Sequence, residues 1–241
     1  MRKAMSKILI VCGGTLADAF LEVEYRRFSP DVCIAVDGAL EHFARTGLRV
    51  THMVGDFDTV RPEMLEQFSD GSRYIERHCP QKNETDTELA VMLALELAPE
   101  EIEILGATGN RMDHTLANLD MLYEPYRAGV PCRIVDACNE ITLIGSKVFL
   151  KPDPRYKYVS FFPFTDHITN LCLRGFAYPI EGYEIRRGKK SGRCVSNEIT
   201  AETAEVSIGE GLLFCIRSRD PKAERSDQKE ECVCTEPGYS D

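Results

Sequence analysis

Up to about residue 139, short apolar segments alternate with stretches of helical periodicity. The apolar segments span residues 7–12, 32–36, 51–54, 102–105 and 132–135, with a further short strand expected at 72–76. The helical stretches span 16–27, 39–45, 62–68, 85–97 and 114–127. Strands that alternate with helices in this way are typical of a mostly parallel sheet with helices on both faces. The alternation therefore predicts an α/β fold for this part of the chain.

The pattern changes at about residue 141. Short segments rich in β-branched and aromatic residues follow, separated by Gly, Pro and Asp, with no long helical period between them. Such a pattern is typical of an antiparallel sandwich or barrel. We predict a Rossmann-like α/β domain at residues 1–139 and an antiparallel β-sandwich domain at 140–220. A disordered tail is predicted at 221–241, where charge is high and large apolar residues are nearly absent.

The clearest helical signal begins at Thr85. Thr85 and Glu88 have the spacing of a capping box, in which the first side chain caps the helix and the acid lies three residues later. Pro99 ends the segment. The pattern predicts an apolar face made of Leu89, Met92, Leu93 and Leu97.

The composition excludes several classes of protein. A net charge of -10 argues against general nucleic-acid binding, which requires a clustered basic surface. No segment approaches the roughly 20 apolar residues needed to cross a membrane, and the first apolar run is too short for a signal peptide. We therefore expect a cytoplasmic protein without nucleic-acid or membrane partners.

The cysteines predict neither a zinc site nor structural disulfides. The chain has 10 cysteines, and most lie in apolar segments without the paired spacing of metal ligands. In a reducing compartment such cysteines behave as small buried hydrophobic residues. Cys232 and Cys234 form a Cys-x-Cys pair in the polar tail, which is a weak metal signal.

Two aspartates, Asp56 and Asp58, follow the predicted strand at 51–54. Residues at the carboxyl ends of parallel strands gather on one edge of the sheet, where ligands of such folds bind. Asp37 and Asp113 also follow predicted strands, and Asp86 lies in the first turn of a predicted helix. A solvated turn would explain Asp56 and Asp58 alone, and helix capping would explain Asp86. Several carboxylates around one cleft repel one another unless a cation joins them, so the set predicts a Mg²⁺ site.

Residues 106–114 form a second informative segment, because glycines precede the start of a predicted helix. Glycines allow close backbone approach to a ligand, and helix N-termini bind phosphate. Arg111 could bind phosphate oxygens in a bidentate manner, with Lys82 as a second positive charge. The alternative is a glycine-rich connection with a surface arginine. His114 is either a residue of the helix N-terminus or a proton carrier.

Motifs of other nucleotide-binding and hydrolytic enzymes are absent from the sequence. The chain has no Gly-x₄-Gly-Lys-Ser/Thr loop, and its first strand does not end in Gly-x-Gly-x-x-Gly. It also has no Gly-x-Ser-x-Gly nucleophile elbow.

Taken together, the motifs resemble those of the thiamine pyrophosphokinase (thiamine diphosphokinase) family, bacterial type. The matching segments, in order, are Asp37-Gly38-Ala39, Val54-Gly55-Asp56-Phe57-Asp58-Thr59, Lys82-Asn83-Glu84-Thr85-Asp86, Gly109-Asn110-Arg111-Met112-Asp113-His114, and Ser191-Gly192 with Cys194-Val195-Ser196-Asn197-Glu198. Ser218-Arg219-Asp220 is also similar to bacterial members. Asn83 and Asn110 depart from the family pattern, where aspartate and glycine are common. Asn83 removes one carboxylate that could have bound the cation, so the predicted cation site depends on the other aspartates.

The resemblance implies transfer of pyrophosphate from ATP to the hydroxyl of thiamine, with Mg²⁺ as cofactor and release of AMP. It also implies a homodimer whose active sites lie between the α/β domain of one subunit and the β-sandwich domain of the other. Asp56, Asp58, Asp86 and Asp113 would hold the metal, and Asp37 or Asp113 would orient and deprotonate the hydroxyl. The implied nucleotide-binding residues are Lys82, Asn83, Thr85, Gly109, Arg111 and His114, and the implied thiamine-binding residues are Ser191, Ser196 and Asn197.

Two other functions remain open on the sequence. Asp56 to Val60 fits the Asp-x-Asp-x-Thr/Val motif of haloacid-dehalogenase-type phosphatases, although that motif normally ends the first strand and here ends the third. The chain could also be a non-catalytic regulator that binds a nucleotide or thiamine. The many costly carboxylates argue against a protein that only binds.

Overall fold

The computed structural model describes residues 6–57, 60–68, 74–77, 84–189 and 192–221. The elements of its first part are β1 (Lys7–Val11), α1 (Asp18–Phe28), β2 (Val32–Val36), a 3₁₀ turn (Asp37–Ala39), α2 (Leu40–Thr46), β3 (His52–Gly55), α3 (Pro62–Phe68), β4 (Tyr74–Arg77), α4 (Asp86–Glu96), β5 (Glu101–Leu105), α5 (Met112–Asp120), α6 (Tyr123–Arg127) and β6 (Cys132–Val135). The second part contains β7 (Asn139–Ile144), β8 (Val148–Leu150), β9 (Tyr158–Pro163), β10 (His167–Arg174), β11 (Ile180–Arg186), a 3₁₀ turn (Gly192–Cys194), β12 (Ala204–Ser207) and β13 (Leu213–Ser218).

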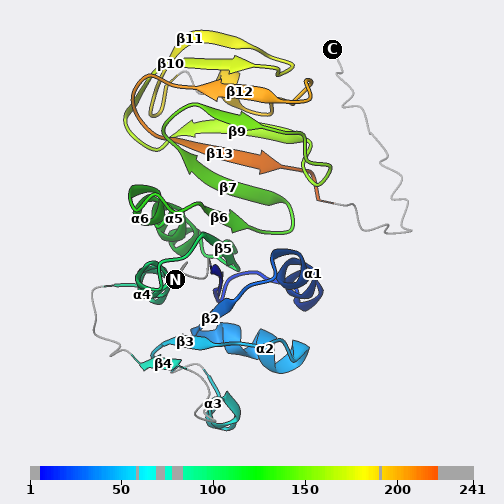
Figure 1. The fold of residues 1–241 in the computed structure, drawn as a ribbon, viewed down its shortest axis with the longest axis vertical. Helices are drawn as coiled ribbons and strands as arrows, with labels where there is room; N and C mark the ends of the chain where they lie inside the picture. The colour runs from blue at the N-terminus through cyan, green and yellow to red at the C-terminus, as the bar shows by residue number, and fades with distance from the viewer. Residues whose placement is uncertain (1–5, 58–59, 69–73, 78–83, 190–191, 222–241) are drawn as a thin grey trace, which may run out of the picture.

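The strands form two sheets. Within the described residues, the larger sheet has nine strands in the order β4-β3-β2-β1-β5-β6-β7-β13-β9, and the smaller one has the order β11-β10-β12-β8. The pairs from β4 to β6 are parallel, whereas β7, β13 and β9 pair antiparallel. Figure 1 shows the parallel part and the β-sandwich at opposite ends of the long axis. The predicted fold class is confirmed.

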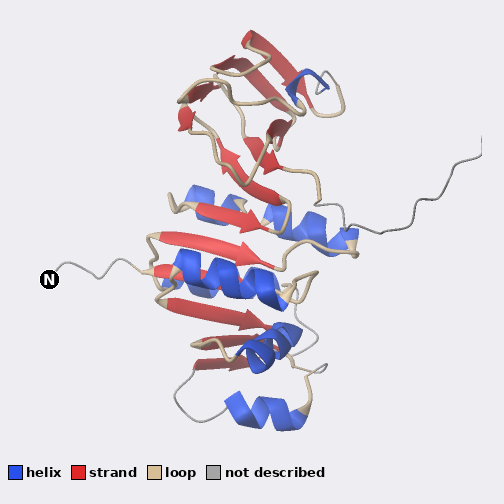
Figure 2. Ribbon diagram, turned by 90° about the vertical axis from the view of Figure 1, so that its right-hand side faces the viewer, coloured by secondary structure: helices blue, strands red, loops and turns tan. Residues whose placement is uncertain are grey.

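The parallel strands are apolar throughout because both faces of the sheet are covered. In β1, Leu9 and Val11 pack with α1 and α2 on one face, and Ile8 and Ile10 pack with α4 on the other. This burial on both faces explains why the sequence shows continuous apolar runs in place of alternation. Figure 2 shows the helices beside the stacked strands.

Two details of the helices differ from the sequence prediction. The predicted helix at 114–127 is two helices, α5 and α6, because Pro125 has no N–H for the carbonyl of Met121 and its ring would clash with that carbonyl. In α4, Met92 is 48% exposed, and the buried stripe contains Ala90, Val91 and Ala94. The small residues Ala90 and Ala94 let this face of the helix lie close to the sheet. Met92 lies on another face of the helix, which is open to solvent.

The two parts of the chain share one sheet. β7 begins at Asn139, where the domain boundary is predicted, and it pairs with β6 on one side and with β13 on the other. A third core lies between the β7-β13-β9 strands and the smaller sheet, around Phe161, Leu171 and Val206. The boundaries at 139 and 220 remain predictions, and the predicted disordered tail falls outside the described residues beyond position 221.

Seven cysteines lie in the described part of the chain, and all of them are free thiols. None of the helices that the structure describes is long and apolar enough to cross a membrane.

Candidate active site

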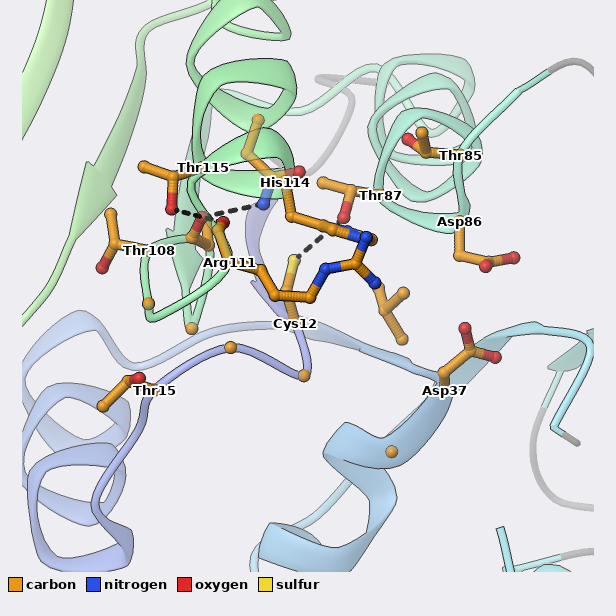
Figure 3. Close-up of a pocket in the computed structure, with 18 of the residues that line it drawn as sticks. Cys12, Thr15, Asp37, Thr85, Asp86, Thr87, Thr108, Arg111, His114 and Thr115 are labelled. Carbon is orange, nitrogen blue, oxygen red and sulfur yellow. Dashed lines mark hydrogen bonds between the residues drawn. The ribbon is translucent and has the colours of Figure 1, made fainter. Parts of the chain in front are cut away.

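A pocket of about 650 Å³ opens at the carboxyl ends of β1, β2 and β5. Its walls are the loops at residues 12–15, 36–38 and 106–111 and the N-terminal turns of α4 and α5. Figure 3 shows this arrangement, with side chains from all of these segments around one space. The predicted edge of the sheet therefore borders a substantial pocket in the structure.

The loops after β1 and β5 lie in direct contact. The Gly14 N–H donates to the Gly106 carbonyl at 2.8 Å, and the Thr15 N–H donates to the Thr108 carbonyl at 2.9 Å. A Cβ added at Gly14 would lie 2.3 Å from the Gly106 oxygen, and one at Gly109 would lie 2.9 Å from the Thr15 nitrogen. The space left by these glycines is thus filled by the neighbouring loop. This differs from the sequence interpretation, in which the glycines gave room to a ligand.

Asp37 and Asp86 face each other at one side of the pocket (Figure 3). Asp37 directly follows β2 and has a φ of 45°, and its Oδ1 accepts the Phe57 N–H at 3.3 Å. A Cβ on Gly55 would lie 1.7 Å from that oxygen, so the third strand must end in glycine for the Asp37 carboxyl to fit. Asp86 is the first residue of α4.

The environment of Asp37 disfavours its charge. Burial raises its pKa to about 7, and the hydrogen bond with Asp86 and the charge of Asp86 act in the same direction. The Phe57 N–H opposes this shift, and the charge of Asp56 adds to it. The pair therefore favours a shared proton or a bound cation.

The five predicted catalytic aspartates do not all meet. Asp56 is close enough to affect Asp37 electrostatically, and Asp58 lies outside the described residues. Asp113 is exposed and does not line the pocket; its Oδ2 accepts a hydrogen bond from Arg111 Nη2 at 2.5 Å, which lowers the pKa of Asp113. Among the residues that the structure describes, no group of three or more His, Cys, Asp or Glu side chains is arranged to hold a metal ion.

The predicted nucleotide-binding residues have different surroundings. Thr85 caps α4, since its hydroxyl accepts the Glu88 N–H at 3.2 Å, which confirms the predicted N-cap. Arg111 is the N-cap residue of α5, but its side chain makes no capping hydrogen bond. Gly109, Arg111 and His114 all line the pocket. The Arg111 side chain is 71% exposed. Lys82, Asn83 and Ser191 lie outside the described residues.

Several pocket residues were missed by sequence reasoning. The hydroxyl of Thr87 donates to the Cys12 sulfur at 3.5 Å, and burial raises the pKa of Cys12 to about 12. Asn118 is 7% exposed, and its Nδ2 donates to the Ala107 carbonyl at 2.8 Å. An asparagine one turn after His114, on the inner face of a helix, is the signal that could have identified it.

Asn197 is buried, with 0% of its surface exposed. Its Oδ1 accepts the N–H groups of Tyr178 at 3.0 Å and Glu198 at 2.9 Å, and its Nδ2 donates to the Tyr178 carbonyl at 2.8 Å. This buried amide thus bonds the backbone of Tyr178 and Glu198, which gives it a structural role; its predicted contact with thiamine stays a prediction. Ser196 is exposed and has a φ of 55°, and its N–H donates to the Ser160 hydroxyl at 2.9 Å.

The fold and the pocket define an α/β protein with an acidic ligand site at the carboxyl edge of its parallel strands and a β-sandwich built onto the same sheet. Two protein-family models match the chain: the catalytic domain of thiamin pyrophosphokinase at residues 28–134 and the vitamin B1 binding domain of thiamin pyrophosphokinase at residues 146–213. The chain belongs to the thiamin pyrophosphokinase family and is an enzyme of that family.

Individual relatives agree with this assignment. The thiamine pyrophosphokinase of Bacillus subtilis (strain 168) is 32% identical over 188 residues, which cover 78% of this chain and 87% of the relative. A crystal structure of thiamine pyrophosphokinase from Bacillus subtilis superposes with a TM-score of 0.80 at 29% identity, over 89% of this chain and 100% of that one. The thiamin pyrophosphokinase structure from Geobacillus thermodenitrificans gives a TM-score of 0.77 at 31% identity, over 89% and 98%.

Proposed function

We propose that this chain transfers pyrophosphate from ATP to the hydroxyl of thiamine, giving thiamine diphosphate and AMP, with Mg²⁺ as cofactor. The observation that carries the proposal is the pair of facing carboxylates, Asp37 and Asp86, in a pocket whose other wall is the start of α5 with Arg111. A polyphosphate would fit between an acidic side that would hold a cation and a side formed by the start of α5 and a guanidinium.

The acidic side of the pocket fits a divalent cation by its chemistry. Mg²⁺ prefers carboxylate oxygens and phosphates. Burial raises the pKa of Asp37 and the charge of Asp86 adds to the shift, and a bound cation would offset both effects. We propose Asp86 and Asp56 as ligands within the described residues, with Asp58 as a third. When bound, Mg²⁺ would neutralise charge on the polyphosphate. The surface position of Asp113 and its pairing with Arg111 support a role in orienting that arginine instead of binding metal.

Asp37 is the proposed proton acceptor. The thiamine oxygen would form a bond to the β-phosphorus of ATP, the bond from that phosphorus to the bridging oxygen of AMP would break, and the hydroxyl proton would pass to Asp37. A carboxyl group with a pKa near neutrality suits this task. Arg111 and the N–H groups at the start of α5 would stabilise the charge that develops on the phosphates, which is the main demand of phosphoryl transfer.

We propose that Tyr178 forms one wall of the thiamine subsite. Tyr178 is 66% exposed as a residue, yet Asn197 holds its backbone by two hydrogen bonds, and the exposed Ser196 lies beside this asparagine in the sequence. An exposed aromatic ring on a fixed backbone suits stacking on a cationic heteroaromatic molecule. In this scheme Asn197 acts through Tyr178.

The positions of the two proposed subsites support a homodimer. Within the described residues, every side chain that lines the large pocket comes from positions 12–118, whereas Tyr178 and Ser196 belong to the β-sandwich. In Figure 1, β11 and β10 of the sandwich lie toward the opposite end of the long axis from β3, which Asp56 follows. We therefore propose that the sandwich of one subunit faces the pocket of a second subunit, which supplies the thiamine subsite.

The test is an assay of the purified protein with ATP, Mg²⁺ and thiamine, followed for thiamine diphosphate and AMP. Asp37→Asn should lower kcat by at least ~100-fold, the usual range for loss of a general base. Asp166→Asn, on the exposed turn between β9 and β10, serves as the matched control and should keep wild-type activity. Phosphate release from a simple phosphomonoester, without AMP formation from ATP, would contradict the proposal and favour a phosphatase. Binding of both substrates without turnover would favour a regulator.

A further inference from the structure

The loop between β5 and α5 is held in place by hydrogen bonds from outside the pocket. The Thr108 hydroxyl donates to Asp136 Oδ2 at 2.9 Å. The Thr108 carbonyl accepts the Thr15 N–H at 2.9 Å, so the position of this one residue also affects the loop after β1. Thr108 therefore connects both loops of the pocket to the end of β6.

Asp136 is itself held in a tight turn between β6 and β7. Its Oδ1 accepts the N–H groups of Cys138 and Asn139, each at 2.8 Å, and its own N–H donates to the Asn139 carbonyl at 2.9 Å. The carboxylate thus has a fixed orientation, with Oδ2 directed toward Thr108. A hydrogen bond to a charged, oriented acceptor is stronger than one between neutral groups.

Arg219 contacts the same turn from the end of β13. Its Nε and Nη2 donate to the Ala137 carbonyl at 3.0 and 2.7 Å, and its backbone N–H donates to the Cys138 carbonyl at 3.0 Å. The two side-chain bonds join positions that are 82 residues apart in the sequence. Neither Asp136 nor Arg219 lines the pocket, and both lie outside the segments matched by the family models.

We propose that Asp136 and Arg219 are positioning residues for the nucleotide, acting through Thr108 on the loop at residues 106–111. The inference rests on the proposed use of ATP in this pocket. Arg219 fixes the turn, the turn orients the Asp136 carboxylate, and the carboxylate holds the Thr108 hydroxyl. Loss of this chain of bonds frees the loop that places Arg111 and the start of α5, so it weakens ATP binding and leaves the thiamine subsite intact.

The test compares Thr108→Val and Arg219→Met with wild type. Thr108→Val removes only the donated bond, and Arg219→Met keeps the length of the side chain while removing its donors. Each should raise KM for ATP about 10-fold, as expected for losing a bond to a charged or oriented acceptor, and should also lower kcat because Arg111 is no longer held in place. KM for thiamine should stay within about two-fold of wild type. Thr108→Ser should restore the wild-type KM. Thr142→Val, which removes a threonine hydroxyl on β7 away from the pocket, is the matched control.

The double variant distinguishes a shared pathway from two independent effects. If both residues act through Asp136, Thr108→Val combined with Arg219→Met raises KM for ATP by clearly less than the product of the single effects. An unchanged KM for ATP in either single variant, fully multiplicative effects, or an equal rise of both KM values would overturn the inference. A wild-type protein that makes no thiamine diphosphate from ATP would instead refute the proposed function. Thermal melting of each variant confirms that it is folded.

Discussion

Replacing Asp37 with asparagine should stabilise the ligand-free protein while it abolishes activity. Asparagine has the same shape, so its Oδ1 keeps accepting the Phe57 N–H. Its amide N–H₂ can also donate to Asp86, where wild type has two acidic groups in contact. The substitution therefore removes a repulsion without creating a cavity.

The size of the effect follows from the shifted pKa. The pKa of Asp37 rises from 3.8 to about 7. At 1.36 kcal/mol per unit this corresponds to an upper limit of about 4 kcal/mol. Asp37 borders an open, solvated pocket, so screening reduces the gain to about 1–2 kcal/mol. For a chain of this length the melting temperature should rise by about 3–6 °C.

The sign of the pH dependence is fixed by linkage. The folded state has the higher pKa, so between pH 3.8 and about 7 it binds more protons than the unfolded state does. Wild-type stability is therefore lost as pH rises through this window, and the penalty is complete above pH 7. The gain from Asp37→Asn should be full at pH 8 and roughly a third of that at pH 5.

The assay is thermal melting of both proteins at pH 5 and pH 8 in the presence of a chelator. Asp18→Asn is a control of opposite sign, because hydrogen bonds from Arg45 and His42 lower the pKa of Asp18 to about 2. Replacing the Asp18 carboxylate with a neutral amide should reduce the melting temperature at pH 8. The reasoning is refuted if Asp37→Asn lowers the melting temperature at pH 8, or if its gain is the same at both pH values.

Three further predictions concern the acidic side of the pocket and the proposed thiamine subsite. Gly55→Ala places a Cβ 1.7 Å from Asp37 Oδ1 at a residue whose φ is 148°. Urea denaturation should therefore show that the free energy of unfolding falls by at least ~2 kcal/mol. The control is Gly129→Ala, where φ is also positive but the surrounding space is open, and its expected loss is ~1 kcal/mol. Asn197→Ala should raise KM for thiamine more than KM for ATP, because Tyr178 loses its support; equal changes would argue against this role. Chelation of divalent cations should abolish thiamine diphosphate formation, and added Mg²⁺ should restore it; full activity in excess chelator would exclude the metal.

The sequence predicts the parallel part of the fold well, because burial on both faces produces continuous apolar strands. It also places Asp37 and Asp86 at one edge, since strand ends and helix starts of such sheets converge. The sequence could not show that Asp113 does not line the pocket. Its position depends on how α5 is oriented and on the ion pair with Arg111. Asn197 shows the same limit: residue type suggests a ligand contact, whereas only packing reveals that its amide is used by Tyr178.

The continuous sheet restricts how this enzyme can move. β7 pairs with β13 along its whole length and with β6 over residues 140–142, so that Thr142 pairs with Arg133 on one side and with Cys215 on the other. A hinge between the two halves would have to break these backbone ladders, so domain closure is not available to the enzyme. Exclusion of water from the pocket must come from loop movement or from a second subunit. For the same reason, a fragment cut at Asn139 would expose the edge of β6, so the catalytic half is not a separable module.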